Sequence, residues 1–261
     1  MKVAVAFVAL ASLLVVSELR AEPTRAPGLA FGSVAGEVTL GAASALSLTT
    51  YFLDQRPSAW GPDRARPKDL DFDAASDVMG GAGGVVWLVP FTYALEAAHL
   101  DAAGLDEPFA RAARLPLLQA EALGFAVGAT YALKRSFGRC RPRAWVGGRC
   151  AGGEYDAFPS GHTVTVSALA GVSLSLLVRN EGRMGARATS FALTEMAALS
   201  AAALRVLAGA HSTEDVAAGW LLGHGAGLAV GFVHPMEDAA PTGPAPTLGA
   251  VPTTFTIDGN V

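Results

Sequence analysis

The chain has 261 residues, of which 51% are hydrophobic and 16% are charged, and its formal net charge is −4. The length suffices for one large domain or two small ones, and the apolar content excludes an intrinsically disordered chain. The negative net charge argues against a nucleic-acid partner.

The N-terminus has the pattern of a secretory signal peptide. Lys2 is followed by an apolar stretch from Val3 to Val16 and by a small residue, Ala21, at a suitable cleavage position. The stretch is short for a membrane span, so cleavage is favoured over an uncleaved anchor. We therefore expect residues 1–21 to be a signal and the protein to be exported to the periplasm or cell envelope.

Six apolar segments of helical length follow the signal. They cover residues 29–53, 82–100, 115–133, 161–178, 189–208 and 216–233. Because few stretches alternate apolar and polar residues, the pattern predicts an all-α bundle of about six helices. The connectors are polar and rich in helix breakers, and they cover residues 54–73, 138–157 and 178–187. We expect one domain over residues 22–236 and an extended Pro/Thr/Ala-rich tail over residues 237–261.

Membrane attachment stays open at this stage. Polar residues interrupt several segments, which is costly against lipid; they are Glu37, Gln119, Glu121 and Glu195. Glycine recurs at every fourth position from Gly219 to Gly231, as in membrane helices that touch closely, and a tightly packed soluble core gives the same pattern. A cleaved signal followed by six spans would place the arginine-rich turn at 178–187 outside, against the positive-inside tendency.

The first of three polar clusters is basic and runs from Lys134 to Pro142, at the end of the third segment. Lys134 and Arg141 lie seven positions apart within it. Such a run is usually a solvated loop, but here it follows an apolar helix and stops at a proline, so several cations could point to one place. Arginine matches phosphate oxygens with paired donors.

The second cluster, Pro159 to His162, opens the fourth segment. Ser160 suits the N-cap of a helix, and Gly161 leaves the first turn open to close approach. Free N–H groups and the helix dipole at such a terminus attract anions. His162 follows directly, although a capped helix with one histidine is usually no more than that.

The third cluster runs from Arg205 to Asp215. His211 and Asp215 are four apart and would share one helix face, where a carboxylate fixes the tautomer of a histidine and raises its basicity. Ser212 and Asp215 also fit a capping box, which makes Asp215 structural. Arg205 lies in an apolar stretch, so it is expected to have an anionic partner, for which a bound phosphate would serve.

Other chemistries find little support in the sequence. It contains neither a Walker-type loop nor an acidic cluster for Mg²⁺, which argues against nucleotide-driven phosphoryl transfer. A G-x-S-x-G elbow is also missing. The two cysteines, Cys140 and Cys150, do not fit a four-ligand metal site. They could pair in an oxidising compartment or remain as separate thiols, and the spacing does not decide.

Together the clusters resemble the signature of the type 2 phosphatidic acid phosphatase superfamily, which includes bacterial non-specific acid phosphatases, lipid phosphate phosphatases and vanadium haloperoxidases. The family pattern is K-x6-R-P, then P-S-G-H, then S-R-x5-H-x3-D. Lys134, Arg141 and Pro142 match the first part, residues 159–162 match the second, and the third matches from Arg205 onward. Leu204 departs from the family serine. The resemblance is strong over residues 115–233.

The resemblance implies an active site at one end of the bundle and a role for each matched residue. His211 would attack phosphorus and form a phosphohistidine, Asp215 would orient it, and His162 would protonate the leaving oxygen and then activate water. The phosphate-binding residues would be Lys134, Arg141, Ser160, Gly161 and Arg205. No metal or other cofactor is implied, and vanadate would bind as a phosphate mimic.

The expected function is that of a metal-independent phosphatase acting on a phosphomonoester or pyrophosphate. The substrate would be a lipid phosphate or a small organic phosphate, and the protein could associate with a membrane. Two alternatives are a vanadate-dependent haloperoxidase, because vanadate occupies the same cradle, and an inactive helical envelope protein that retains the motifs. The sequence indicates no oligomeric state.

Overall fold

The computed structural model describes residues 61–179 and 184–234, together with seven separate positions between 41 and 60. The expected signal at residues 1–21, nearly all of the first expected helix at 29–53, and the tail at 237–261 lie outside the described residues. Glu37 lies outside them as well.

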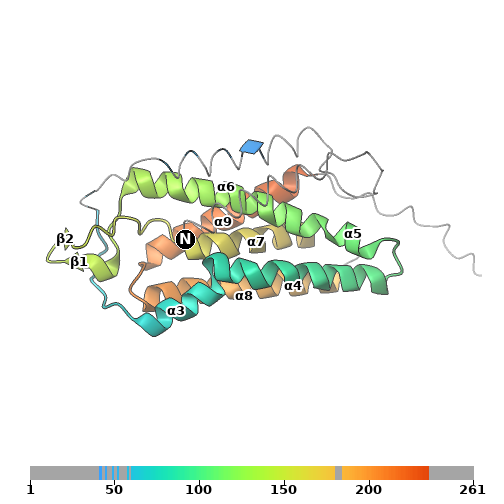
Figure 1. The fold of residues 1–261 in the computed structure, drawn as a ribbon, viewed down its shortest axis with the longest axis horizontal. Helices are drawn as coiled ribbons and strands as arrows, with labels where there is room; N and C mark the ends of the chain where they lie inside the picture. The colour runs from blue at the N-terminus through green and yellow to red at the C-terminus, as the bar shows by residue number, and fades with distance from the viewer. Residues whose placement is uncertain are drawn as a thin grey trace, which may run out of the picture.

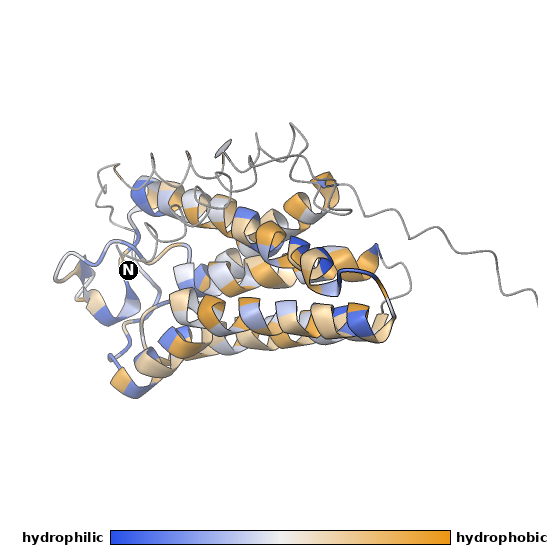
Figure 2. Cartoon of the chain, turned by 45° about the vertical axis from the view of Figure 1, so that its right-hand side comes forward, coloured by the Kyte–Doolittle hydropathy of each residue, from blue (hydrophilic) through white to orange (hydrophobic). Residues whose placement is uncertain are grey.

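Within these ranges, long helices form an elongated bundle, which confirms the all-α prediction (Figure 1). They are α4 (Gly81–Ala102), α6 (Arg114–Phe137), α7 (Gly161–Val178), α8 (Met184–Leu207) and α9 (Thr213–Val233). Helix α7 is the central one, since it contacts the other four. Its Val164, Leu169 and Val172 are fully buried in the main hydrophobic core. Figure 2 shows pale and orange residues along the helices, with blue gathered at helix ends and in loops.

The connectors hold more structure than the sequence predicted. Helix α3 (Leu70–Met79) begins inside the expected connector 54–73, and α5 (Pro108–Ala112) precedes α6. Residues 138–157 contain a 3-10 turn, η2 (Pro142–Ala144), and a hairpin of β1 (Trp145–Val146) and β2 (Arg149–Cys150). Helix α8 begins at Met184, so the prediction of a turn through residue 187 was wrong.

A side-chain cap explains the start of α3. Asp69 accepts hydrogen bonds from the backbone N–H groups of Asp71 and Phe72, at 3.0 and 3.2 Å. Such a cap stabilises a helix start by about 1 kcal/mol. This helix was not predicted because charged residues surround its start, and helices are predicted from the periodicity of apolar residues.

The glycine stripe serves the contact between α7 and α9. A Cβ atom built on Gly223 would lie 2.4 Å from the carbonyl oxygen of Val164, and one on Gly227 would lie 2.3 Å from that of Ala168. Backbones this close exclude a larger residue. The stripe therefore holds α9 against the central helix.

The polar residues that interrupt the helices have partners inside the bundle. Glu121 accepts a hydrogen bond from Nε2 of His234 at 2.7 Å, Gln119 donates to Thr92 at 3.2 Å, and Glu195 lies 2.9 Å from His224. These contacts offset the free-energy cost of burying each polar side chain. Polar interruptions are thus compatible with a membrane setting.

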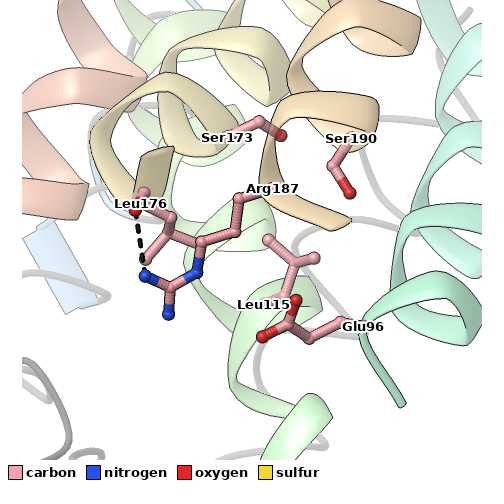
Figure 3. A pocket seen from close by; sticks show the side chains of 6 residues that line it. All are labelled: Glu96, Leu115, Ser173, Leu176, Arg187 and Ser190. Atoms are coloured by element: carbon pink, nitrogen blue, oxygen red, sulfur yellow. Dashed lines mark hydrogen bonds between the residues drawn. The ribbon is translucent and has the colours of Figure 1, made fainter. Parts of the chain in front are cut away.

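A further polar pocket lies at the end of the bundle away from the hairpin. Figure 3 shows the guanidinium of Arg187 donating to the carbonyl of Leu176, at 3.0 Å, beside Ser173, Ser190 and Glu96. These residues come from the C-terminal half of α7, the start of α8 and the second half of α4. The pocket is therefore separate from the three polar clusters, which lie at the other ends of these helices.

Within the part of the chain that the structure describes, four stretches are long and apolar enough to cross a membrane: residues 70–102, α7, α8 and α9. Large apolar side chains are exposed on α4 and α8, among them Val86, Phe91, Met196 and Leu199. Large apolar side chains exposed along a helix of membrane-spanning length are compatible with contact with lipid. Length, composition and exposure together support association with a membrane.

Candidate active site

The three predicted clusters meet at the hairpin end of the bundle (Figure 1). A Cβ atom built on Gly161 would lie 4.0 Å from Cε of Lys134, which joins the first cluster to the second. The backbone N–H of Ser160 donates to the carbonyl of Asp215 at 2.9 Å, which joins the second to the third. Sequence-distant motifs thus form one site.

His211 lies between the end of α8 and the start of α9 and is 1% exposed. Its Nδ1 is 3.7 Å from Oδ2 of Asp215, and among the described residues this nitrogen has no hydrogen-bond partner. Burial, followed by the positive charges of Arg141 and Lys134, holds the pKa of His211 well below its usual value. The ring is therefore neutral at physiological pH, the form that a nucleophile needs.

Asp215 is fully buried in the first turn of α9 and has two strong partners. Its Oδ2 accepts the backbone N–H of Ser212 at 2.8 Å, the acidic half of a capping box, and its Oδ1 accepts Nη1 of Arg139 at 2.8 Å. The predicted capping role and the predicted proximity to His211 therefore occur together. Arg139 was not predicted as a site residue.

Ser160 occupies the N-cap position of α7, as predicted, but its side chain does not cap the helix. Its fully buried hydroxyl accepts a hydrogen bond from Oγ1 of Thr163 at 3.1 Å. The predicted N-cap position is therefore confirmed, although the hydroxyl accepts from a side chain of the first turn and not from its backbone. The first backbone N–H groups of α7 are thus not bound by that hydroxyl, and Gly161 begins the helix beside Lys134.

Lys134 and Arg141 come from the end of α6 and the loop that follows. Lys134 is buried, donates to the backbone carbonyl of Asp156, and has a pKa lowered to about 8, chiefly by burial. Arg141 makes a bidentate pair with the Asp156 carboxylate, at 2.7 and 2.8 Å. Burial opposes ionisation of Asp156, but the hydrogen bonds and charge of Arg141 hold the pKa of that carboxyl well below its usual range.

Arg205 is buried in the last turn of α8 and meets α3. Its Nη1 donates to Oδ1 of Asp73 at 2.6 Å and to Oγ of Ser76 at 3.0 Å. A protein carboxylate thus supplies the anionic partner expected for this arginine. Asp73 also accepts Nη1 of Arg143 at 3.2 Å, so α3 is tied to two arginines of the site.

The family comparison agrees with this arrangement. A model of the PAP2 superfamily matches residues 115–237. This match agrees with the resemblance of the sequence motifs to the type 2 phosphatidic acid phosphatase superfamily. Neither the search of curated proteins nor that of solved structures produced a match.

The PAP2 range contains every predicted site residue and begins after α3 and α4. The match supports phosphatase-type hydrolysis of a phosphate-bearing substrate. The carboxylates of α3 lie outside the matched range, so they are additions that the family motifs do not describe. Asp156 lies within the range but outside the motifs.

Cys140 and Cys150 form a disulfide, with their Cα atoms 5.7 Å apart. The bond closes a loop that carries Arg141, Arg143 and the hairpin. It joins the two ends of the segment that presents Arg141. Closing a loop of this length restricts the unfolded chain.

We expect replacement of both cysteines by serine to lower the free energy of unfolding by about 3 kcal/mol, through the greater entropy of the open loop. Denaturant unfolding of the double variant and of the oxidised wild type measures the difference. Reduced wild type should unfold like the variant. Equal midpoints for the oxidised wild type and the variant would contradict the prediction.

Proposed function

We propose that this protein is a metal-independent phosphatase that hydrolyses a phosphomonoester or pyrophosphate through a phosphohistidine intermediate. One observation carries the proposal: a buried, neutral His211 faces the combined charge of Lys134, Arg141 and Arg205, with His162 at the adjoining helix start. The cations supply the positive charge that stabilises a phosphoryl group in transfer. A resident metal is not required for this chemistry.

In the first step, Nε2 of His211 attacks phosphorus while the bond to the leaving oxygen breaks. Asp215 lies on the Nδ1 side of the ring and orients it, and His162 gives its proton to the leaving oxygen. In the second step, His162 takes a proton from water, the resulting hydroxide attacks phosphorus, and the N–P bond breaks. Phosphate leaves, and His162 again carries a proton.

In this proposal Arg141 and Arg205 keep their carboxylate partners and bind the phosphate in addition. Their guanidinium groups, now bonded to Asp156 and Asp73, would turn part of their donors to phosphate oxygens. Each arginine carries five donors, so it can hold a carboxylate and a phosphate oxygen at once. The paired carboxylates fix both side chains in place.

Phosphate release by the purified full-length protein tests the function. The panel contains phosphatidic acid, an isoprenoid pyrophosphate and a soluble phosphomonoester, each assayed with and without EDTA. We expect release from one or more of them that EDTA does not affect. Halide oxidation on addition of vanadate, without phosphate release, would favour the haloperoxidase instead. Separation of soluble and membrane pools tests the proposed envelope location.

Phosphate binding should weaken above pH 8 because of Lys134. Below its pKa of about 8 the ammonium is charged, and above that pH one of three phosphate-binding charges is lost. A charge-assisted hydrogen bond contributes about 1.5–3 kcal/mol, so the Kd for inorganic phosphate should rise at least about tenfold between pH 7 and 9.5.

Calorimetric titration with inorganic phosphate measures this effect, with the Lys134→Arg variant as control. Arginine keeps its proton throughout that pH range. The Kd of the variant should therefore lack the rise that deprotonation of Lys134 causes in the wild type. A wild-type Kd that stays constant from pH 7 to 9.5 would rule out Lys134 as a titrating ligand.

A further inference from the structure

Helix α3 places a carboxylate against His162. Oδ1 of Asp77, in the last turn of α3, is 2.7 Å from Nε2 of His162. This distance is that of a short hydrogen bond between a carboxylate and an imidazole. Asp77 lies outside the range matched by the PAP2 superfamily, and no family motif assigns it a role.

The contact is held from several sides. Helix α3 is fixed to α8, because Asp73 and Ser76 both accept hydrogen bonds from Arg205. At the other end of α3, the backbone N–H of Asp69 donates to the carbonyl of Ala208 at 3.4 Å. A helix anchored at both ends can present Asp77 in one position.

The junction of α3 and α4 also bounds the imidazole. Gly81 has a φ of 58°, which favours glycine, and a Cβ atom built there would lie 3.1 Å from Nε2 of His162. The backbone thus passes close to the same ring edge that Asp77 holds. This packing leaves little freedom for the ring to turn.

The charges around His162 give Asp77 a chemical purpose. Burial, followed by the charges of Arg205 and Arg141, lowers the pKa of His162 to about 4, and the charge and hydrogen bond of Asp77 oppose that shift. A group that protonates a leaving oxygen must hold its proton until the bond breaks. A carboxylate on Nε2 favours the protonated ring.

We propose that Asp77 is the positioning residue for His162: it orients the ring and favours the protonated form that gives a proton to the leaving group. The proposal rests on the proposed function, since it assigns His162 the proton transfer. With Nε2 engaged by Asp77, the proton given to the leaving oxygen comes from Nδ1. Asp77 itself does not touch the substrate.

An alternative role for Asp77 predicts a different effect of its removal on catalysis. Oδ1 of Asp77 is also 3.7 Å from Nη1 of Arg205, so the carboxylate could compete with phosphate for that arginine. Its removal would then improve binding and lower KM. Under our proposal, its removal lowers kcat and leaves KM nearly unchanged, because binding of the phosphoryl group depends on the three cations.

The test compares Asp77→Asn with Asp71→Asn, the same substitution at an exposed position of the same helix. Short-chain phosphatidic acid has a poor leaving group that needs a proton, and p-nitrophenyl phosphate has a good one. We expect Asp77→Asn to lower kcat about 10- to 100-fold on phosphatidic acid, part of the ~10²–10⁴-fold that general acid catalysis supplies. The loss on p-nitrophenyl phosphate should be several-fold smaller, and Asp71→Asn should match wild type.

A double-mutant cycle then connects the two residues. In a His162→Ala background, Asp77→Asn should cause no further loss, because its effect passes through that ring. An unchanged kcat, a lowered KM with unchanged kcat, or equal losses with and without His162 would overturn the inference. If His162→Ala itself kept the wild-type rate on both substrates, the proposed function would fail as well.

Discussion

His211→Ala should remove phosphate release almost entirely, with a loss of about 10⁴-fold or more in kcat. Without the imidazole there is no group to accept the phosphoryl group from the substrate, and the three cations can only bind it. Release of inorganic phosphate from the best substrate of the panel measures the effect. Substrate carrying labelled phosphorus should label the wild type on a histidine and leave the variant unlabelled.

The matched control is His99→Ala, because His99 lies in the second half of α4, away from the site. It should keep wild-type activity. His162→Ala adds a positive test: with p-nitrophenyl phosphate the first step proceeds, while the second lacks its base, so labelled enzyme should accumulate. A His211→Ala protein that folds and releases phosphate at the wild-type rate would disprove the mechanism.

Most of the bundle could be predicted because its helices are long and apolar. The expected segment 161–178 coincides with α7, since Pro159 and Ser160 mark its start and the central helix is apolar on all sides. Helix α3 was missed for the opposite reason: one face is acidic and meets arginines rather than the core. Hydrophobic periodicity carries no information about a helix held by ion pairs.

The site, like the fold, could be predicted only in part. Motif spacing placed Lys134, Arg141, Arg205 and the two histidines at helix ends, and the structure brings those ends together. Motif spacing could not predict a place in the site for Asp73 or Asp77, because these residues lie more than 50 positions before the first motif residue. Long-range ion pairs depend on how helices pack, and a single sequence does not contain that arrangement.

Arg139 is the clearest example of a residue that spacing could not separate from its neighbours. It is one of several arginines in the basic run, yet it is 3% exposed and pairs with Asp215. Its guanidinium also lies 4.6 Å from the ring centroid of Trp60, which packs against Phe137 and Phe158. Arg139 thus joins the carboxylate beside His211 to this aromatic cluster.

Arg139→Met should therefore lower both stability and activity. It leaves the Asp215 carboxylate buried without its cation, and breaking such a pair costs about 3–5 kcal/mol of unfolding free energy. Denaturant unfolding measures this cost, and kcat should fall because Asp215 no longer holds its position beside His211. Arg149→Met, at an exposed position of the hairpin, is the matched control and should change neither quantity.

The double variant Arg139→Met with Asp215→Asn separates the two contributions. Because it removes both charges, it should recover part of the lost stability. The losses in unfolding free energy of the two single variants should therefore add up to more than the loss of the double variant. Activity should not recover, since the carboxylate that orients His211 is gone. Strictly additive losses in stability would mean that Arg139 supports the fold through Trp60 and the aromatic cluster, and that its ion pair with Asp215 contributes little.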